Sequence, residues 1–427
     1  MTTTTKIDAF APTRRIELPT MFQRQVRAAT LARLRTLRLG RLVIRDQGDV
    51  FEFGEATSGQ HPVAHIDVTH PAFWTSIAFG GSIGAGEAWM LGYYRSPSLV
   101  DVIRVMALNR DALEKLEGGL ARVLAPLNRL WHKFRDNTVR GSRDNIVAHY
   151  DLGNDFYKLW LDRSMAYSSA IFDRPDMTLD EAQEAKFDRI CRKLDLRPTD
   201  HLVEIGTGWG GLAIHAASRF GCRVTTTTIS PSQAAWARKA IADAGLGDRI
   251  TVVEKDYRHL EGRYDKLVSV EMIEAVGAAW FDTYFKTCSD LLKPDGQMLI
   301  QAITIEERHY DNAVKNVDFI QRYIFPGSCI PSMRAMMESV ARATDLRLFH
   351  HEDFTPHYAT TLRLWRERFF DRLPEVRALG FDDRFIRMWE FYLAYCEGGF
   401  AERAIGVVHG LFTKPHCRRA PVQPPLH

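Results

Sequence analysis

The sequence predicts an α/β fold: a parallel sheet covered by helices on both faces, preceded by a smaller mixed α/β domain. Three observations lead to this prediction. From residue 201 onward, short apolar runs alternate with amphipathic helical segments, which is typical of parallel strands joined by crossover helices. The first run ends in a glycine-rich turn at 206–211, where glycines let a ligand approach bare backbone. Residues 42–68 alternate β-branched and aromatic residues with turn residues, which indicates a small separate sheet.

The larger domain is expected to build its sheet in chain order, after a leading helix at 179–194. The expected strands are 201–205, 223–229, 250–254, 264–270, 298–304 and 405–412, and the expected helices are 212–220, 232–244 and 280–291. Two aromatic-rich helices, 362–370 and 381–400, predict either a lid over an apolar substrate or ordinary core packing. Ligands of such a sheet bind at the carboxyl ends of its strands.

Changes in composition divide the chain into two domains. We predict a disordered tail at 1–18, an N-terminal domain at 19–135 that associates with lipid or membrane, a linker at 136–145, the larger domain at 146–415 and a tail at 416–427. Arginines interleaved with leucines over 24–45 either lie on an anionic membrane surface or form a solvated helix face. A helix is expected at 120–134, before the linker. A glycine-rich stretch at 77–86 lacks the Gly-Lys-Ser/Thr ending of a phosphate loop, so we expect a packing turn there.

Composition narrows the partners and the compartment. The formal net charge is only +3 over 427 residues, and no basic stripe lies in the larger domain, so nucleic acid is not an expected partner. The six cysteines show no Cys-x-x-Cys spacing, which argues against a metal cluster and for a reducing compartment. No run approaches about 18 apolar residues, the length of a membrane span. We therefore expect a cytoplasmic protein that binds no metal and meets a membrane only peripherally.

The glycine turn narrows the class of cofactor. A nicotinamide-binding domain usually ends its second strand with a carboxylate that holds the ribose, but this strand ends Thr225-Thr-Thr-Thr-Ile-Ser230. The segment Glu204-Ile-Gly-Thr-Gly-Trp-Gly-Gly211 instead matches the Asp/Glu-x-Gly-x-Gly-x-Gly turn of methyltransferases that use S-adenosylmethionine (SAM). The larger domain is thus predicted to be a Rossmann-like class I SAM-dependent methyltransferase domain with a helical lid.

Further motifs follow in order between about residues 145 and 412. They are His149-Tyr-Asp-Leu-Gly-Asn-Asp-Phe156, Met165-Ala-Tyr-Ser-Ser169, Thr228-Ile-Ser-Pro-Ser-Gln233, Asp256-Tyr-Arg258, Val270-Glu-Met-Ile-Glu-Ala-Val-Gly277, Tyr323-Ile-Phe-Pro326 and Tyr358-Ala-Thr-Thr-Leu362. With them the chain closely resembles the cyclopropane fatty acyl phospholipid synthases and their mycolic-acid relatives. The resemblance implies transfer of a methyl carbon from SAM to the double bond of unsaturated phospholipid acyl chains, through a carbocation, to give a cyclopropane.

The same resemblance assigns nine residues to the cofactor, each with an alternative role as a turn or capping residue. They are Tyr167 and Ser168 at the methionine end, Gly206, Thr207 and Gly208 at the exposed backbone, Thr228 and Gln233 at the ribose, and Asp256 and Tyr257 near the adenine.

The resemblance places the chemistry at four positions: Glu274, Tyr358, Ser169 and Gln301. In the family, a bicarbonate bound by Glu, Tyr, Cys and His takes the proton whose loss closes the ring. Glu274 and Tyr358 match, whereas Ser169 and Gln301 stand where Cys and His are usual. Both can hydrogen-bond an anion, but Gln301 cannot carry positive charge. Two outcomes stay open: bicarbonate binds and a cyclopropane forms, or the cation is quenched into a methyl- or methylene-branched chain. The alternative role for Glu274 is a carboxylate at a helix N-terminus.

Aromatic side chains at Tyr323, Phe325 and Trp365 are expected to line the acyl pocket, because ring faces stabilise a cation, with core packing as the alternative. The resemblance implies the bilayer surface and unsaturated acyl chains as partners, peripheral association with the inner membrane face, and a homodimer formed through the N-terminal domain. Two other classes stay open: a non-catalytic lipid-binding protein, and a methyltransferase of another substrate.

Overall fold

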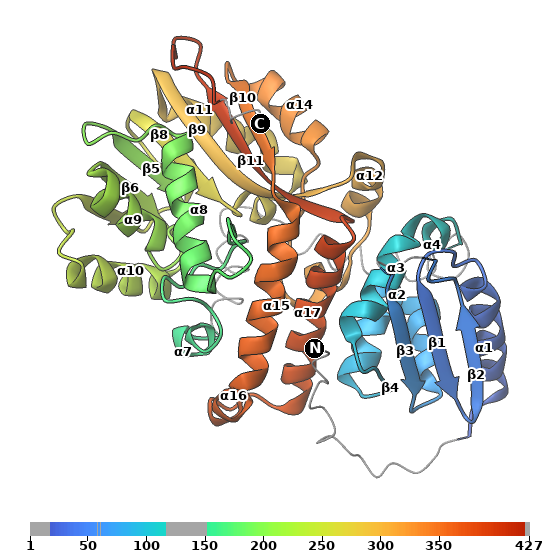
Figure 1. Cartoon of the computed structure of the whole chain (residues 1–427). Helices are drawn as coiled ribbons and strands as arrows, with labels where there is room; N and C mark the ends of the chain where they lie inside the picture. The colour runs from blue at the N-terminus through green and yellow to red at the C-terminus, as the bar shows by residue number, and fades with distance from the viewer. Residues whose placement is uncertain (1–17, 58, 60, 117–151, 423–427) are drawn as a thin grey trace. The chain divides into compact units, whose positions relative to one another are not determined.

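The computed structural model describes residues 18–57, 59, 61–116 and 152–422 (Figure 1). The predicted tail up to residue 17, the helix at 120–134 and the linker at 136–145 lie outside these residues. The chain forms two compact units, which we describe one at a time. The first contains the described residues up to 116, Asn316–Ile324 and Arg377–Ala404, and the second contains the rest. No helix in the described part is both long and apolar enough to cross a bilayer.

The second unit is built on a seven-stranded sheet in the order β10-β11-β9-β8-β5-β6-β7 (Figure 1). The strands are β5 (His201–Ile205), β6 (Arg223–Thr227), β7 (Ile250–Val253), β8 (Tyr264–Val270), β9 (Leu292–Ile305), β10 (Arg347–Asp353) and β11 (Ile405–Thr413). Neighbours from β5 to β9 are parallel, whereas β11 runs antiparallel to β9 and β10 antiparallel to β11. The predicted parallel sheet and late strand are confirmed; β10, whose side chains are mostly exposed, was not predicted.

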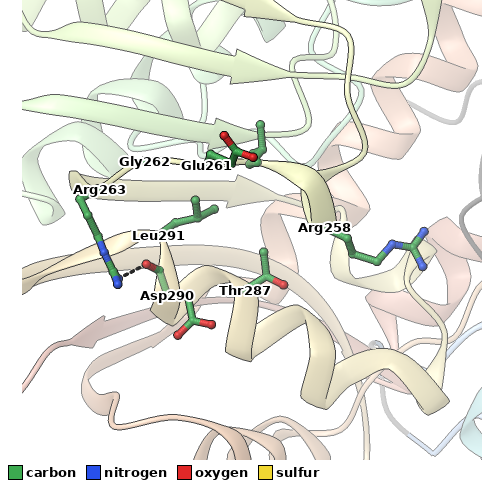
Figure 2. Close-up of a pocket in the computed structure, with 8 residues that line it drawn as sticks. Arg258, Glu261, Gly262, Arg263, Thr287, Asp290 and Leu291 are labelled. Carbon is green, nitrogen blue, oxygen red and sulfur yellow. Dashed lines mark hydrogen bonds between the residues drawn. The ribbon is translucent and has the colours of Figure 1, made fainter.

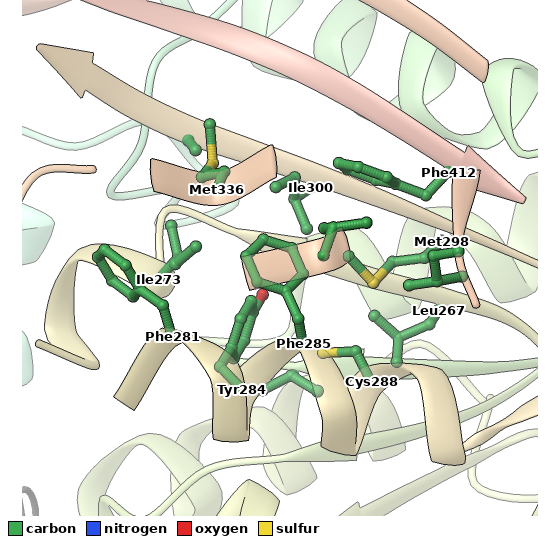
Figure 3. Close-up of a cluster of buried hydrophobic side chains, with 14 of the residues drawn as sticks. Leu267, Ile273, Phe281, Tyr284, Phe285, Cys288, Met298, Ile300, Met336 and Phe412 are labelled. Carbon is green, nitrogen blue, oxygen red and sulfur yellow. The ribbon is translucent and has the colours of Figure 1, made fainter. Parts of the chain in front are cut away.

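Alternation along each strand sends successive side chains to opposite faces of this sheet. Leu202 and Leu299 point to the face covered by α8 (Leu179–Lys193), α9 (Gly211–Phe220) and α10 (Pro231–Asp243). Their neighbours Val203 and Ile300 point to the face covered by α11 (Phe281–Asp290) and α14 (Met333–Ala343), whose buried cluster is drawn in Figure 3. Each face of the sheet therefore packs against its own apolar cluster. Because the strands are buried on both faces, their sequences are continuous apolar runs.

Shorter elements and one long helix complete the second unit. They are α7 (Asn154–Lys158), η2 (Tyr257–His259), η3 (Ile273–Ala275), η4 (Ala278–Trp280), α12 (Glu307–Lys315), α15 (Thr355–Asp371) and α16 (Leu373–Ala378), the last of which ends in the first unit. The predicted helix at 362–370 is the second half of α15.

The first unit contains the predicted small sheet, in the order β2-β1-β3-β4. Its elements are α1 (Met21–Leu34), β1 (Arg41–Asp46), β2 (Asp49–Phe53), β3 (Val63–Val68), α2 (Ala72–Met90), β4 (Tyr94–Arg95), α3 (Leu99–Leu108), α4 (Arg110–Leu116), α13 (Phe319–Tyr323) and α17 (Asp383–Ala401). The predicted helix at 381–400 is α17, and it packs on α2 and α3. The Trp89 indole N–H donates to Glu390 at 3.2 Å, and Arg104 pairs with Glu402 at 2.6 Å.

The glycine-rich stretch at 77–86 is helical, so the predicted turn was wrong. It belongs to α2, which bends at Gly81 (φ 53°, ψ −132°). A Cβ on Gly84 would lie 1.9 Å from the Ser76 carbonyl oxygen, and one on Gly86 would lie 2.3 Å from the Phe319 ring. The glycines are therefore required by close packing across the bend and against α13.

Candidate active site

The glycine turn lies at the carboxyl end of β5, between β6 and β8, where the strand order reverses. Gly206 and Gly208 have φ of 100° and 51°, a region that favours glycine. The Gly206 and Thr207 amides donate to the Thr227 carbonyl, each at 3.0 Å, which holds the turn against β6. A Cβ built on Gly208 would meet nothing within 4 Å, so the backbone faces open space there. The turn fits the predicted nucleotide-like cofactor at the reversal point of the sheet.

Hydroxyl and amide groups of β6 and α10 continue this edge. Thr228 donates to the Gln233 side-chain oxygen at 2.9 Å, and both side chains are buried. The Thr226 hydroxyl lies 2.7 Å from that of Thr207 and 2.6 Å from the Glu204 carboxyl group. Burial raises the pKa of Glu204 to about 8, so this carboxyl group holds a proton at neutral pH.

Asp256 and Tyr257 stand together on η2, after β7. Both oxygens of Asp256 accept from the Arg258 guanidinium, at 2.8 and 2.7 Å. Burial acts to raise the pKa of Asp256, but the bonds from Arg258 outweigh it and hold the pKa below its usual value. The Tyr257 ring packs edge-on against Tyr284 with centroids 5.7 Å apart. An adenine role for the two residues stays a prediction, and the Asp256 carboxylate is already paired with an arginine.

Ser168 sits over a buried lysine. The Lys186 ammonium group on α8 donates to the Ser168 hydroxyl at 2.6 Å, and Lys186 is fully buried. Burial lowers the pKa of Lys186 to about 8, against the opposing pull of Glu271, Asp162 and Glu204. The Lys186 ammonium group therefore carries a positive charge at neutral pH close to the carboxyl groups of the site.

Aromatic rings gather around Tyr167. Ring centroids lie 5.4 Å from it at Trp365, 6.2 Å at Phe325 and 5.4 Å at Trp160, and the Tyr358 ring lies 6.1 Å from Trp365. Two of the three predicted pocket residues, Phe325 and Trp365, are thus brought together. Tyr323 belongs to the first unit, where its hydroxyl donates to Glu87 on α2.

Three of the four residues predicted for the chemistry converge on a carboxylate that was not assigned a role, that of Glu271. The Ser169 backbone amide and the Gln301 side-chain amide donate to its Oε1 at 2.9 and 2.8 Å, and the Tyr358 hydroxyl donates to its Oε2 at 2.6 Å. Glu271 directly follows β8 and has φ of 47°, which is strained for a residue with a side chain. Its place at a strand's carboxyl end was the available sequence signal.

Glu274, the predicted active-site carboxylate, lies one turn further on η3. Its Oε1 accepts from the Ile303 backbone amide, while Oε2 has no hydrogen-bond partner among the described residues. Burial, and then the nearby charge of Glu271, raise the pKa of Glu274 to about 8. Since Glu271 has three donors and Glu274 one, we assign the proton at neutral pH to Glu274 and the negative charge to Glu271.

The second unit also has a polar hollow of about 230 Å³ (Figure 2). Its lining residues Glu261–Arg263 and Asp290–Leu291 flank the amino end of β8, whereas Glu271 follows the carboxyl end. The hollow is also lined by Arg258, which pairs with Asp256, but by none of the residues that hydrogen-bond Glu271.

Known proteins share both the sequence and the fold. Residues 137–410 match the profile of a family described as mycolic acid cyclopropane synthetase. The chain is 40% identical over 360 residues to the tuberculostearic acid methyltransferase of Mycobacterium tuberculosis, covering 82% of this chain and 84% of that protein. It is 36% identical over 374 residues to the cyclopropane-fatty-acyl-phospholipid synthase of Escherichia coli, covering 84% and 90%. A solved mycolic acid cyclopropane synthase, complexed with SAH and CTAB, is 31% identical with a TM-score of 0.60, covering 64% of this chain and 98% of that one.

Proposed function

Because this chain belongs to the mycolic acid cyclopropane synthetase family, and so is a SAM-dependent methyltransferase that alkylates lipid acyl chains, we propose that it converts a double bond in the acyl chain of a membrane phospholipid into a cyclopropane. The observation that carries the proposal is the Glu271 carboxylate, which accepts three hydrogen bonds at the end of β8 next to the turn that fits the cofactor and to which we assign the negative charge of the site. An alkene carries no proton to remove before it is methylated, so the site must manage a cation formed afterwards.

Different residues would hold the cofactor, stabilise the cation and exclude water. SAM supplies an electrophilic methyl group, and the Gly206–Gly208 turn, with Thr228 and Gln233, would hold it. The π electrons of the alkene form the new C–C bond to the methyl carbon while the bond from that carbon to sulfur breaks, its electron pair leaving with S-adenosylhomocysteine, and a positive charge is left on the neighbouring acyl carbon. We assign the stabilisation of this charge to the Glu271 carboxylate and to the ring faces of Tyr167 and Trp365. The buried Trp365 and the partly buried Tyr167 also exclude water, which would otherwise add to the cation.

A second candidate product is a methylene-branched chain, which would become a methyl-branched chain only after a two-electron reduction by a separate hydride donor. The similarity of this chain to the tuberculostearic acid methyltransferase of M. tuberculosis supports a branched product, because the name of that protein describes methylation and not ring formation. In ring formation, the transferred methyl group loses a proton and its C–H electrons close a bond to the cationic carbon. In the branched route, a hydride first moves from the methylated carbon to the cationic carbon, and the methyl group then loses its proton to form a C=CH₂ group. Both routes need a base at the same methyl group.

The test is the lipid product. The purified chain is incubated with SAM and dioleoyl phosphatidylglycerol vesicles, and the acyl chains are analysed by mass spectrometry after derivatisation of olefins. We expect a gain of one CH₂ and no reaction as an olefin. A gain of one CH₂ with olefin reactivity retained would establish the branched product, and no gain of mass would refute the alkylation itself.

We also propose that the first unit contacts the bilayer surface. Leu18, Met21 and Phe22 at the start of α1 are exposed by 82%, 78% and 57%, and Arg24 follows them. Apolar side chains beside a positive charge suit the interface of an anionic membrane. Co-sedimentation should be stronger with phosphatidylglycerol than with phosphatidylcholine vesicles; equal recovery with both would contradict the charge argument.

A further inference from the structure

The residues expected to hold bicarbonate are occupied by the protein's own carboxylate. The donors at Ser169, Gln301 and Tyr358 all point to Glu271 at 2.6–2.9 Å. The Ser169 hydroxyl donates to the Ala170 carbonyl at 3.0 Å and is not directed at an anion either. A bicarbonate placed among these donors would have to displace Glu271 and stand beside its negative charge. The residues present therefore do not fit a bound bicarbonate.

A buried relay determines which end of the Gln301 amide faces Glu271. The Lys193 ammonium group can only donate, and it lies 3.0 Å from His409 Nδ1, so that nitrogen accepts. His409 Nε2 then carries the hydrogen and donates to Gln301 Oε1 at 2.9 Å. The amide NH₂ is left facing Glu271 Oε1. His409 is fully buried, and burial, then the charge of Lys193, hold its pKa well below the usual value, so it is neutral.

Every described group that hydrogen-bonds the Glu271 side chain is thus a donor, which is what an ionised carboxylate requires. A carboxylate offers about four lone-pair positions. Two on Oε1 are used by Ser169 and Gln301, and one on Oε2 by Tyr358. One position on Oε2 is left to take a proton from a substrate.

We infer that Glu271, in place of a bound bicarbonate, is the base that removes the proton from the transferred methyl group. The C–H bond of that group breaks, its electron pair closes the bond to the cationic carbon, and the proton goes to Glu271 Oε2. This inference rests on the proposed alkylation of an acyl double bond. It predicts an enzyme that does not depend on dissolved carbon dioxide.

The first experiment uses the wild-type chain, SAM and dioleoyl phosphatidylglycerol vesicles in buffer purged of carbon dioxide, with and without added bicarbonate. We expect the two rates of product formation to agree within twofold. A tenfold or greater loss in the purged buffer, restored by bicarbonate, would overturn the inference while leaving the alkylation intact. Absence of any methylated lipid in either buffer would instead refute the proposed function.

The second experiment removes the Glu271 side chain. Glu271→Gly suits the backbone, because φ is 47° there, and leaves a space lined by the three donors. We expect loss of about 100-fold or more in product formation, the usual contribution of a positioned base, and at least tenfold recovery with added formate or bicarbonate. Glu271→Gln, whose amide fills the space, should lose as much and gain nothing from either anion. Wild-type rates for both variants in purged buffer would overturn the inference. Glu261→Gln, at an exposed glutamate, is the matched control.

Discussion

Replacing Tyr358 with Phe removes one hydrogen bond to the proposed base and leaves the ring in place. The Tyr358 hydroxyl donates to Glu271 Oε2 at 2.6 Å, in a partly buried setting. A hydrogen bond to a charged group contributes about 1.5–3 kcal/mol, and 1.36 kcal/mol corresponds to one pKa unit. Loss of the bond should therefore raise the pKa of Glu271 by about 1–2 units, on top of the rise that burial already causes.

The direction of the effect on rate follows from the ionised form being active. The rising limb of the pH–rate profile should move to higher pH by about 1–2 units, so that rates below the limb fall about 10- to 100-fold. At high pH the variant should approach the wild-type rate. The nearby charge of Lys186, which lowers the pKa of Glu271, is unchanged by the substitution.

The assay is kcat at saturating lipid and SAM, measured across the pH range in which the protein stays folded. Tyr310→Phe is the matched control, because Tyr310 packs against the apolar cluster that contains side chains of α11 and α14 and is not among the residues that hydrogen-bond Glu271. A Tyr358→Phe profile with its limb at the wild-type position would refute the reasoning, whatever the height of the plateau. A limb displaced to lower pH would show that the bond stabilises the protonated form.

Two further predictions concern the cofactor edge. Gly208→Val should raise the dissociation constant of SAM at least tenfold by calorimetry, because the new side chain fills the open space at the turn. Gly245→Val is the control: its φ of 68° is similar but it lies in an exposed turn, so this variant should lose only about 1–2 kcal/mol of stability through backbone strain. Equal SAM affinities in the two variants would contradict the assignment. The pKa of Glu204 is raised from 4.5 to about 8, so folding takes up a proton and stability falls as pH rises through that window. The free energy of unfolding of Glu204→Gln, measured in urea, should therefore rise relative to that of wild type by about 3–4 kcal/mol between pH 5 and pH 8, which is the free-energy equivalent of the pKa shift over that range. Glu254→Gln, at an exposed glutamate, should show no such rise. Parallel pH dependences of Glu204→Gln and wild type would contradict the prediction.

Much of the second unit could be predicted from the sequence because its signals are local. A buried parallel strand reads as a short apolar run, and Gly206 and Gly208 mark the turn at which only residues without a side chain allow both the φ angles and a ligand. Exposed strands carry no apolar run and could not be predicted in this way. β10 is a mostly exposed edge strand, and its polar residues Arg347–Asp353 resemble a loop.

Helix partners could not be predicted in the same way. The aromatic face of α17 shows that the helix is buried, but apolar side chains carry no information on what covers them. Its grouping with the first unit depends on steric fit, such as that of Gly398, where a Cβ would lie 2.7 Å from the Ile103 side chain. The bend that makes 77–86 helical also depends on contacts across α2.

The sequence by itself determined the parallel sheet and the turn that fits SAM, and its resemblance to the family indicated four positions for the chemistry. Only the tertiary structure decided what those residues contact. Glu271 and Glu274 are two glutamates three residues apart after one strand, and the resemblance singled out only Glu274. Their difference comes from Gln301 on the neighbouring strand, the Ser169 amide about 100 residues earlier and Tyr358 almost 90 residues later. Three donors meeting at one carboxylate favour its ionised form against the burial that raises its pKa, and convergence of this kind exists only after the chain has folded.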